Sequence, residues 1–172
     1  MYEYGNVVLE VDQNNQPKAF NVYGNSLISR TIGGQTLYYI YNGHGDVTGL
    51  TDSSGNVVAS YYFDAFGNII SQTGTVNNPY KYSGYMHDSE SGLYYLKHRF
   101  YDSTIAIFLQ EDTYRGNQAD PLSLNLYTYC CNEPIMYYDP TGHAGSSTTV
   151  KTDPKTGIRD FIKTTEITKF LA

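Results

Sequence analysis

The sequence predicts an all-β protein made of tandem short β-hairpins. Its 172 residues include 19 Tyr and 16 Gly but no Trp. Tyr suits strands because its ring lies well on a pleated surface, whereas Gly and Asn supply turns. Short apolar runs are separated by turn sequences such as SSGN, a strong hairpin signal. We therefore expect short paired strands throughout, except for a short helical or disordered C-terminal tail.

Length and charge limit the possible functions. The chain has the length of one domain, or of one domain with a tail. Its formal charge of −6 gives no basic footprint, which argues against a nucleic acid or an anionic membrane as partner. No apolar run approaches the roughly 20 residues that span a bilayer. The start MYEYGNVVLE lacks the basic and apolar regions of a signal peptide, so any export would depend on another segment or machine.

Residues 1–70 show a regular alternation of strand and turn signals. Strands are expected at Val7–Asp12, Lys18–Tyr23 and in LYYIYN, separated by the turn sequences NNQPK and IGGQ. Further along, strands are expected at Asp46–Thr51 and Asn56–Phe63. The turns between and beside them are expected at Asn42–Gly45, Asp52–Gly55 and Asp64–Asn68.

An internal repeat punctuates this region. An aromatic residue stands beside or close to Gly at intervals of about 20 residues, in Tyr23-Gly24-Asn25, Tyr41-Asn42-Gly43 and Phe66-Gly67-Asn68. A repeat this short cannot bury its apolar face alone, so neighbouring repeats must stack into a larger sheet. Residues 1–70 therefore look like a segment of something longer.

The run YNGHGDVTGLTDSSGNVVASYYFDAFGNI resembles the YD repeat of bacterial Rhs proteins and their teneurin relatives. The positions that match the repeat pattern are Asp52, Gly55, Asn56, Tyr62, Asp64, Gly67 and Asn68. Asp, Asn and Gly form turns, and Tyr side chains pair across strands, so these residue types have a structural explanation of their own. The motif is interpreted as structural and residues 1–80 as non-catalytic.

Residues 80–143 resemble the Rhs repeat-associated core domain. The similarity lies in PYKYSGYMHDSESGLYYLKHRFYD, FLQEDTYRG and SLNLYTYCCNEPIMYYDPTGH, in that order. In that family, YD repeats coil into a hollow β-shell around a toxic C-terminal segment, and the core domain seals one end as a plug. The resemblance implies YD-repeat hairpins at residues 1–79, the core domain at 80–143 and a variable tail at 144–172, the start of a truncated passenger.

The resemblance also implies an aspartyl autoprotease, which in many family members cuts just after a DPxG motif. Asp112 in FLQED and Asp139 in DPTG occupy the two acid positions, and Asp120 is a weaker candidate. Two carboxylates close together cannot both ionise freely, so one could act as acid while the other activates water. A nearby guanidinium could hold the scissile segment. The cut is expected at or just after His143, with Gly142 and His143 as the cleavage residues.

Two features leave this chemistry open. Asp-Pro-Thr-Gly is also a good β-turn without any catalytic role for Asp139. In addition, the family usually reads YDPxxGRF where this chain reads YDSTIAIF, so Ser103, Ala106 and Ile107 replace Pro, Gly and Arg. Ala is costly at positive φ, and Ile107 cannot bind a carboxylate. The fold is therefore expected more firmly than the cleavage.

The remaining titratable and sulfur-bearing residues have simple structural interpretations. His87 and His98 could form a metal pair or a general base, but nothing completes a ligand set, so they are expected to decorate strands. Cys130 and Cys131 lack CxxC spacing and are expected on opposite faces of a strand. No metal and no cofactor is predicted. In the tail, Ile158, Phe161, Ile162 and Ile167 follow a weak helical period.

Three functions follow from these observations. The first is the structural end of an Rhs shell that encapsulates or presents a C-terminal passenger peptide. The second is a self-cleaving protease that releases this segment, and the third is a surface adhesion module that binds glycan or protein. A short run of hairpins leaves sheet edges open, so the expected partners are the rest of the shell or a second copy. The expected location is a secreted or surface-associated bacterial protein.

Overall fold

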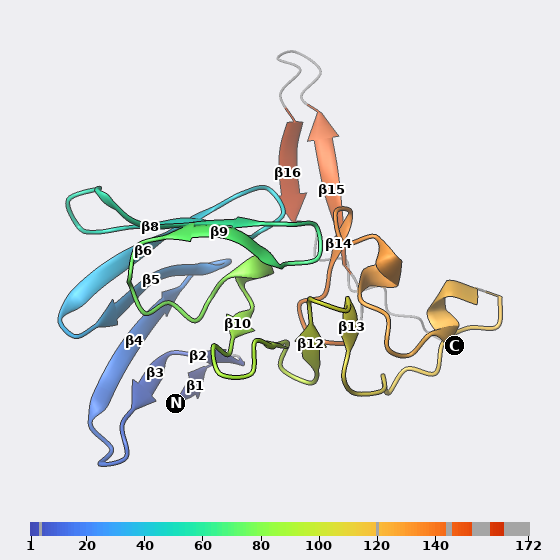
Figure 1. The fold of residues 1–172 in the computed structure, drawn as a ribbon, viewed down its shortest axis with the longest axis horizontal. Helices are drawn as coiled ribbons and strands as arrows, with labels where there is room; N and C mark the ends of the chain where they lie inside the picture. Colours follow the sequence, from blue (N-terminus) through green and yellow to red (C-terminus); the bar gives the residue numbers. More distant parts are fainter. Residues whose placement is uncertain (4, 120, 144–145, 153–158, 164–172) are drawn as a thin grey trace.

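A seven-stranded antiparallel sheet dominates the first half of the chain (Figure 1). The computed structural model describes residues 1–3, 5–119, 121–143, 146–152 and 159–163. Each strand of this sheet pairs with the next one along the chain, which confirms the predicted tandem hairpins. Its strands are β3 (Leu9–Val11), β4 (Pro17–Tyr23), β5 (Leu27–Ile32), β6 (Gln35–Tyr41), β7 (Val47–Thr51), β8 (Val57–Phe63) and β9 (Ile69–Thr73).

The repeat motif builds the turns of this sheet. The Asp52 carboxylate accepts hydrogen bonds from the backbone N–H groups of Ser54 (2.8 Å) and Asn56 (2.9 Å). Asp64 caps the next turn in the same way, through the N–H groups of Phe66 and Asn68. An Asx turn of this kind satisfies backbone donors that the strands leave free. The structural interpretation of the motif is thus consistent with its geometry.

Two strands of the sheet were not expected from the sequence. β5 places the charged Arg30 on the buried face, where it forms an ion pair with Glu10 at 2.6 Å. This charge breaks the apolar alternation that identifies a half-buried strand. β9 is mostly polar and exposed because it lies at the edge of the sheet. Its polar sequence was interpreted as the start of a loop.

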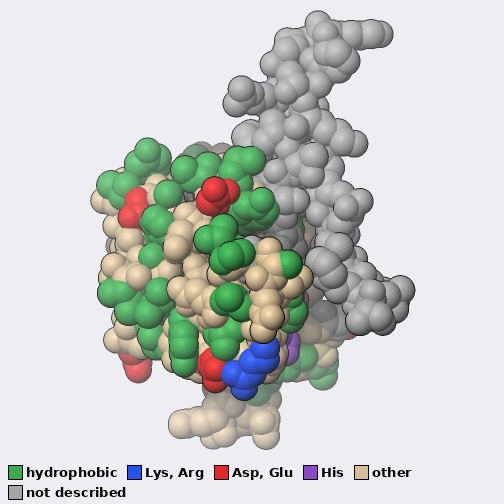
Figure 2. All heavy atoms as spheres, turned by 90° about the vertical axis from the view of Figure 1, so that its right-hand side faces the viewer, with side chains coloured by type: hydrophobic (Ala, Val, Ile, Leu, Met, Phe, Trp, Pro, Cys, Tyr) green, Lys and Arg blue, Asp and Glu red, His purple; other side chains and the backbone are tan. Residues whose placement is uncertain are grey.

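The sheet has one covered and one open face. The covered face carries a core of Leu37, Val47, Leu50, Ala59 and Tyr61. Alternate residues of the same strands point the other way and leave large apolar side chains exposed, namely Phe20, Val22, Tyr38, Ile40 and Tyr62. Seen from the side of the C-terminal half, the surface is largely hydrophobic or uncharged, with few charged side chains (Figure 2).

Residues 80–143 form an irregular region, here called the plug. Its small four-stranded sheet contains β10 (Met86–His87), β11 (Tyr94–Tyr95), β12 (Phe100–Asp102) and β13 (Ile107–Phe108). Three short 3₁₀ turns accompany it: η1 (Tyr82–Gly84), η2 (Pro121–Leu124) and η3 (Cys130–Asn132). A second buried cluster, mostly tyrosine, fills its interior: Tyr82, Tyr85, Tyr94, Leu96, Tyr101, Phe108, Tyr129 and Cys130.

Three tyrosines fix the plug to one repeat turn. The hydroxyls of Tyr82, Tyr101 and Tyr94 donate to three successive backbone carbonyls, those of Ala65 (2.6 Å), Phe66 (2.8 Å) and Gly67 (2.8 Å). Gly67 has φ +95°, and a Cβ atom there would lie 2.6 Å from the Tyr82 ring. The glycine of the repeat therefore allows the plug to pack directly against the turn.

The ends of the chain add short hairpins. β1 (Tyr2–Glu3) pairs with β2 (Asn6–Val7), and β14 (Tyr137–Tyr138) pairs with β15 (Ser146–Thr152). β15 pairs with β16 (Arg159–Lys163), so the short helix or disorder predicted for the tail is wrong for Arg159–Lys163. Pairing with β15, whose Thr148, Thr149 and Val150 are β-branched, favours a strand there over a weak helical period. The other tail residues of the helical prediction, including Ile158 and Ile167, lie outside the described residues.

The two adjacent cysteines lie in a 3₁₀ turn of the plug. Cys130 and Cys131 lie in η3 with left-handed backbones, not on a strand as predicted; Cys130 is buried and Cys131 is exposed. Among the described residues, no helix is long and apolar enough to cross a membrane. The large sheet ends at Thr73 and the plug sheet begins at Met86, while the predicted division at residues 79 and 80 stays a prediction.

Candidate functional site

The DPTG sequence forms a turn that its own aspartate caps. One carboxylate oxygen of Asp139, Oδ1, accepts hydrogen bonds from the backbone N–H groups of Thr141 (3.1 Å), Gly142 (2.7 Å) and His143 (3.3 Å). The N–H group of Asp139 itself donates to the buried Tyr85 hydroxyl at 2.7 Å. The β-turn interpretation of these residues is thus consistent with the geometry, but it uses only one of the two carboxylate oxygens.

Gly142 seats this turn against the plug. Its backbone has φ +81°, and a Cβ atom at this position would lie 2.4 Å from the carbonyl oxygen of Leu96. Only glycine has both this conformational freedom and the small size that the contact requires. The backbone on either side of the Gly142–His143 bond is therefore held against the segment from Leu96 to Arg99.

A buried arginine contacts three of the predicted site residues. The Arg99 Nη2 atom lies 2.7 Å from Oδ2 of Asp112 and 3.6 Å from Oδ2 of Asp139. Its Nε–H donates to the carbonyl oxygen of Gly142, and Nη1 donates to the carbonyl oxygen of Leu126 at 3.1 Å. The guanidinium also lies over the Phe108 ring, 3.6 Å from its centre. Both acids and the expected cleavage position thus converge on one cation.

The charge balance of this cluster differs from that of a simple acid pair. Two adjacent carboxylates repel each other, and sharing one proton is the usual remedy. Here a guanidinium lies between them, so their repulsion is offset by a positive charge instead. Burial lowers the pKa of Arg99, while Asp112 and Asp139 act in the opposite direction. Arginine stays protonated throughout, and the cluster carries two acids around one permanent cation.

Two histidines border the same turn. His98 Nδ1 lies 2.8 Å from the carbonyl oxygen of Thr141, and His143 Nδ1 lies 3.3 Å from Oδ1 of Asp112. The two imidazole rings pack against each other with their centres 4.3 Å apart. His98 was expected only to decorate a strand, and this contact with the turn was not predicted. The peptide bond between Gly142 and His143 is therefore bounded by Arg99, Asp112 and the His98 ring.

A small cavity opens beside these groups. Its volume is about 200 Å³, and its lining includes Arg99, Asp112, Asp139 and His143. A space of this size with several polar partners can hold water molecules. The site therefore combines two carboxylates, a fixed cation, a held backbone carbonyl and room for a nucleophile. Among the described residues, no group of three or more His, Cys, Asp or Glu is arranged to hold a metal ion.

Most of the site predicted from the sequence is brought together. Asp112, Asp139, Gly142 and His143 lie in one cluster, while Asp120 lies outside the described residues. Ile107 replaces the arginine usual in the family, but Arg99, which was not predicted as a site residue, lies beside both acids. Arg99 and Tyr101 share a face of the chain, since side chains alternate along a strand. A lone arginine two residues from a core tyrosine was the signal that could have identified it.

Ile107 lies in β13 next to the core residue Phe108. Its backbone pairs with Asp102 and forms a further bridge with Thr128. Adjacent side chains on a strand point to opposite faces, and it is the Phe108 ring that contacts Arg99. The replacement at position 107 therefore leaves the cation of the cluster in place. Ala106 has φ +60°, the strained backbone anticipated from the loss of glycine.

Known proteins similar to this chain share the repeat shell. The family model described as "Teneurin YD-shell" matches residues 11–135. The tRNA nuclease WapA of Bacillus subtilis is 41% identical over 143 residues, which cover 80% of this chain and 6% of that protein. The double-stranded DNA deaminase toxin A of Burkholderia cenocepacia is 30% identical over 116 residues, covering 62% of this chain and 8% of the toxin. The chain thus spans only a small part of these relatives' length.

Solved structures with the same fold belong to toxin complexes. The crystal structure of TcdB2-TccC3-Cdc42 matches with a TM-score of 0.63 and 22% identity, over 76% of this chain and 7% of that one. A Photorhabdus luminescens Tc holotoxin pore matches with a TM-score of 0.63 and 20% identity, over 91% of this chain and 8% of that one. At this identity the similarity concerns the fold alone.

Proposed function

This chain belongs to the teneurin YD-shell family, and from this premise we propose that it forms the C-terminal end of an Rhs-type β-shell and cuts its own backbone beside Gly142. In this proposal, residues 1–79 are repeat hairpins that continue the shell wall. Residues 80–143 are the plug that closes it, and residues 144–172 begin the passenger that the shell encloses.

The shell role rests on the open edges of the large sheet. Among the described residues, β3 and β9 each pair with a neighbouring strand on one side only. Unpaired edge strands readily take up another strand. The expected occupants are the rest of the shell or a second copy of this chain. This role also accounts for the apolar side chains on the open face, such as Phe20 and Ile40, which further protein could cover.

The relatives support a passenger outside the matched segment. Their names describe different chemistry: one is a tRNA nuclease and another is a DNA deaminase. A segment common to both is not what determines either activity. We therefore assign a toxin passenger to the C-terminal side of residue 143. Similarity to toxins supports a secreted or surface-associated protein, whose export would depend on parts of the protein beyond the matched segment.

The cleavage role rests on one observation: Arg99 contacts Asp112, Asp139 and the carbonyl oxygen of Gly142 at once. In the proposed reaction, a water molecule in the adjacent cavity attacks the Gly142 carbonyl carbon. Asp112 takes a proton from this water, and Arg99 stabilises the negative charge that develops on the carbonyl oxygen. The bond to the His143 nitrogen then breaks, and this nitrogen receives the proton. Asp139 keeps the turn in place.

Intact mass measured over several days tests this reaction. The 19.3 kDa chain should yield two products, residues 1–142 and 143–172, and Asp112→Asn should prevent this. Glu111→Gln is the matched control, since Glu111 forms an exposed ion pair with Arg115 and none with Arg99 among the described residues. Cleavage should continue in this control. A wild-type chain that stays intact under all conditions would exclude the self-cleaving role and leave the shell role standing.

A further inference from the structure

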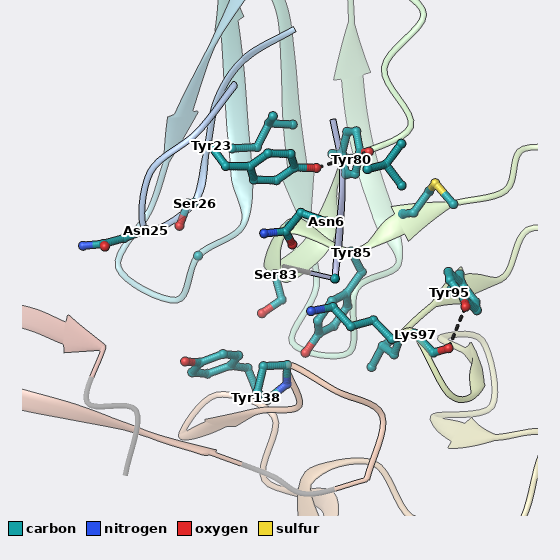
Figure 3. Close-up of a pocket in the computed structure, with 18 of the residues that line it drawn as sticks. Asn6, Tyr23, Asn25, Ser26, Tyr80, Ser83, Tyr85, Tyr95, Lys97 and Tyr138 are labelled. Atoms are coloured by element: carbon teal, nitrogen blue, oxygen red, sulfur yellow. Dashed lines mark hydrogen bonds between the residues drawn. The ribbon is translucent and has the colours of Figure 1, made fainter. Parts of the chain in front are cut away.

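A second, larger cavity shares no lining residue with the one beside the acid cluster. It has a volume of about 440 Å³ and lies between the hairpin β1–β2, the large sheet and the plug (Figure 3). Leu96, Lys97 and His98 line it, whereas the next residue, Arg99, lines the smaller cavity. Its volume is within the range of pockets that hold small molecules, roughly 300–1,000 Å³.

Three polar side chains from different segments converge in this cavity. Asn6 from β2, Ser83 from η1 and Lys97 from the loop after β11 all line it and lie near one another (Figure 3). Ser83 is only 8% exposed, and its Oγ lies near the Tyr85 phenol, whose pKa burial raises and Ser83 lowers, but no hydrogen bond of standard geometry from the described residues reaches it. An unpaired buried hydroxyl is unfavourable and rare in folded proteins. A ligand that bonds to it would remove this cost.

The charge in the cavity has one sign. Lys97 has no carboxylate at ion-pair distance among the described residues, and the cavity lining contains neither Asp nor Glu. Its Nζ atom lies beside Gly5, close to the hairpin turn between β1 and β2. An ammonium group here offers three donors and one positive charge. The cavity is therefore suited to a ligand with one negative charge.

Backbone strain supports the same interpretation. Ser83 and Lys97 have φ values of +50° and +63°, which non-glycine residues seldom adopt. Such conformations persist only where the surrounding structure enforces them, and they cluster at binding sites. Both strained residues line this one cavity. Their backbone geometry aims a hydroxyl and an ammonium at the same space.

We propose that this cavity binds a carboxylate carried on an aromatic or similarly planar group. The donors of Lys97, Ser83 and Asn6 match the acceptor oxygens of a carboxylate, and the rings of Tyr80, Tyr85 and Tyr138 offer apolar faces to the planar group. The carboxylate could belong to a small aromatic acid or to an acidic residue beside an aromatic one in a peptide. This proposal does not require self-cleavage to occur.

Titration calorimetry on the full chain with benzoate and benzamide tests this proposal. The two probes have the same ring, but only benzoate is charged. Benzoate should bind about tenfold more tightly than benzamide, a difference of the size that a charge-assisted hydrogen bond to the exposed Lys97 ammonium supplies. Lys97→Met should remove this preference. Lys18→Met is the matched control, because Lys18 is exposed on β4 and does not line the cavity.

Further measurements identify the ligand source and the donors. Ser83→Ala should weaken benzoate binding about threefold or more, with an unchanged circular dichroism spectrum as evidence of folding. A capped Glu-Tyr dipeptide that binds more tightly than benzoate would indicate a peptide ligand, and the reverse a small acid. The proposal is overturned if benzoate does not bind, if benzamide binds equally well, or if Lys97→Met and Lys18→Met have the same effect.

Discussion

The large sheet and the plug use the same residue types in opposite ways. In the sheet, Asp52 and Asp64 each cap a local turn, and each turn repeats the last one. In the plug, Asp139 caps a turn and also faces Arg99, which contacts two further segments. Local, repeated contacts make a structure tolerant of single changes. Non-local contacts concentrated in a few residues make it sensitive to them.

Backbone strain also differs between the large sheet and the plug. Among the described residues, the non-glycine positions with positive φ in the plug are Ser83, Lys97, Ala106, Cys130, Cys131 and Asn132, whereas the preceding region contains Asn15. The repeat turns place glycine where positive φ is needed. The plug accepts strained residues, which the surrounding packing must compensate. This contrast indicates that the plug geometry serves more than stability.

The largest predicted effect concerns the centre of the plug. Arg99→Met should lower the free energy of unfolding by about 3–5 kcal/mol, because it leaves Asp112 and Asp139 with uncompensated buried charge. Urea denaturation followed by tyrosine fluorescence measures this change. Arg115→Met is the control: its pair with Glu111 is exposed, so its loss should cost less than about 1 kcal/mol. Equal costs for the two variants would contradict the contrast between plug and surface.

The second effect concerns a hydroxyl shared within the plug. The Tyr85 hydroxyl accepts the Asp139 N–H at 2.7 Å and lies 3.0 Å from the Tyr129 hydroxyl. Tyr85→Phe leaves a buried N–H without its partner and should cost about 1–3 kcal/mol in the same assay. Tyr62→Phe on the open face of the sheet should be nearly neutral, since Tyr62 is 64% exposed. A neutral result for Tyr85→Phe would show that the Asp139 turn finds another acceptor.

The third effect concerns the strained backbone at Ala106, where glycine should stabilise the protein and not destabilise it. Ala106 has φ +60°, so Ala106→Gly should stabilise the protein by about 0.5–1 kcal/mol by relieving strain. Ala59→Gly in β8 is the control, because Ala59 is buried in a regular strand. It should instead destabilise by about 1 kcal/mol. The prediction fails if both glycine variants shift the urea midpoint in the same direction.

The smallest effect is a pH dependence at the junction of sheet and plug. His44 Nδ1 lies 2.8 Å from Oδ1 of Asp46, and Nε2 lies 3.3 Å from the carbonyl oxygen of Tyr137. Both partners are acceptors, so both ring nitrogens must carry protons to satisfy them. Burial lowers the pKa of His44, but the hydrogen bond and charge of Asp46 raise it by more, and the net pKa is raised. The other groups around the ring are the neutral Tyr82 phenol and the Pro134 carbonyl.

The raised pKa of His44 determines the direction in which stability changes with pH. The contribution of His44 is fully present below the ordinary histidine value of about 6.5 and is lost as the pH rises through the folded-state pKa. The urea midpoint of the wild type should therefore exceed that of His44→Gln at about pH 5.5, and this gap should narrow toward about pH 9. His87, whose pKa burial lowers, provides a control of opposite sign, since its neutral form is the stable one. If the difference in urea midpoint between the wild type and His44→Gln stays constant over this pH range, the doubly protonated His44 ring between Asp46 and Tyr137 is refuted.

The sequence alone determined the repeat architecture and the identity of the acids. Tyr, Gly and Asx residues act within a few positions of one another, so the hairpins from Asn42 to Asn68 could be predicted from local rules. The resemblance to Rhs core domains identified Asp112, Asp139 and the turn at Gly142. β5 escaped prediction because its buried charge, Arg30, is satisfied by Glu10, 20 positions away.

Only the tertiary structure decided what completes the site. Arg99 meets Asp112 across 13 positions, Asp139 across 40 and Gly142 across 43, separations that no local pattern encodes. The cavity beside Lys97 likewise combines residues from Asn6 to Tyr138. Short-range rules specify turns and strands because they act through neighbouring backbone groups. Ion pairs and cavities arise where distant segments pack together, so their partners become known only once the chain is folded.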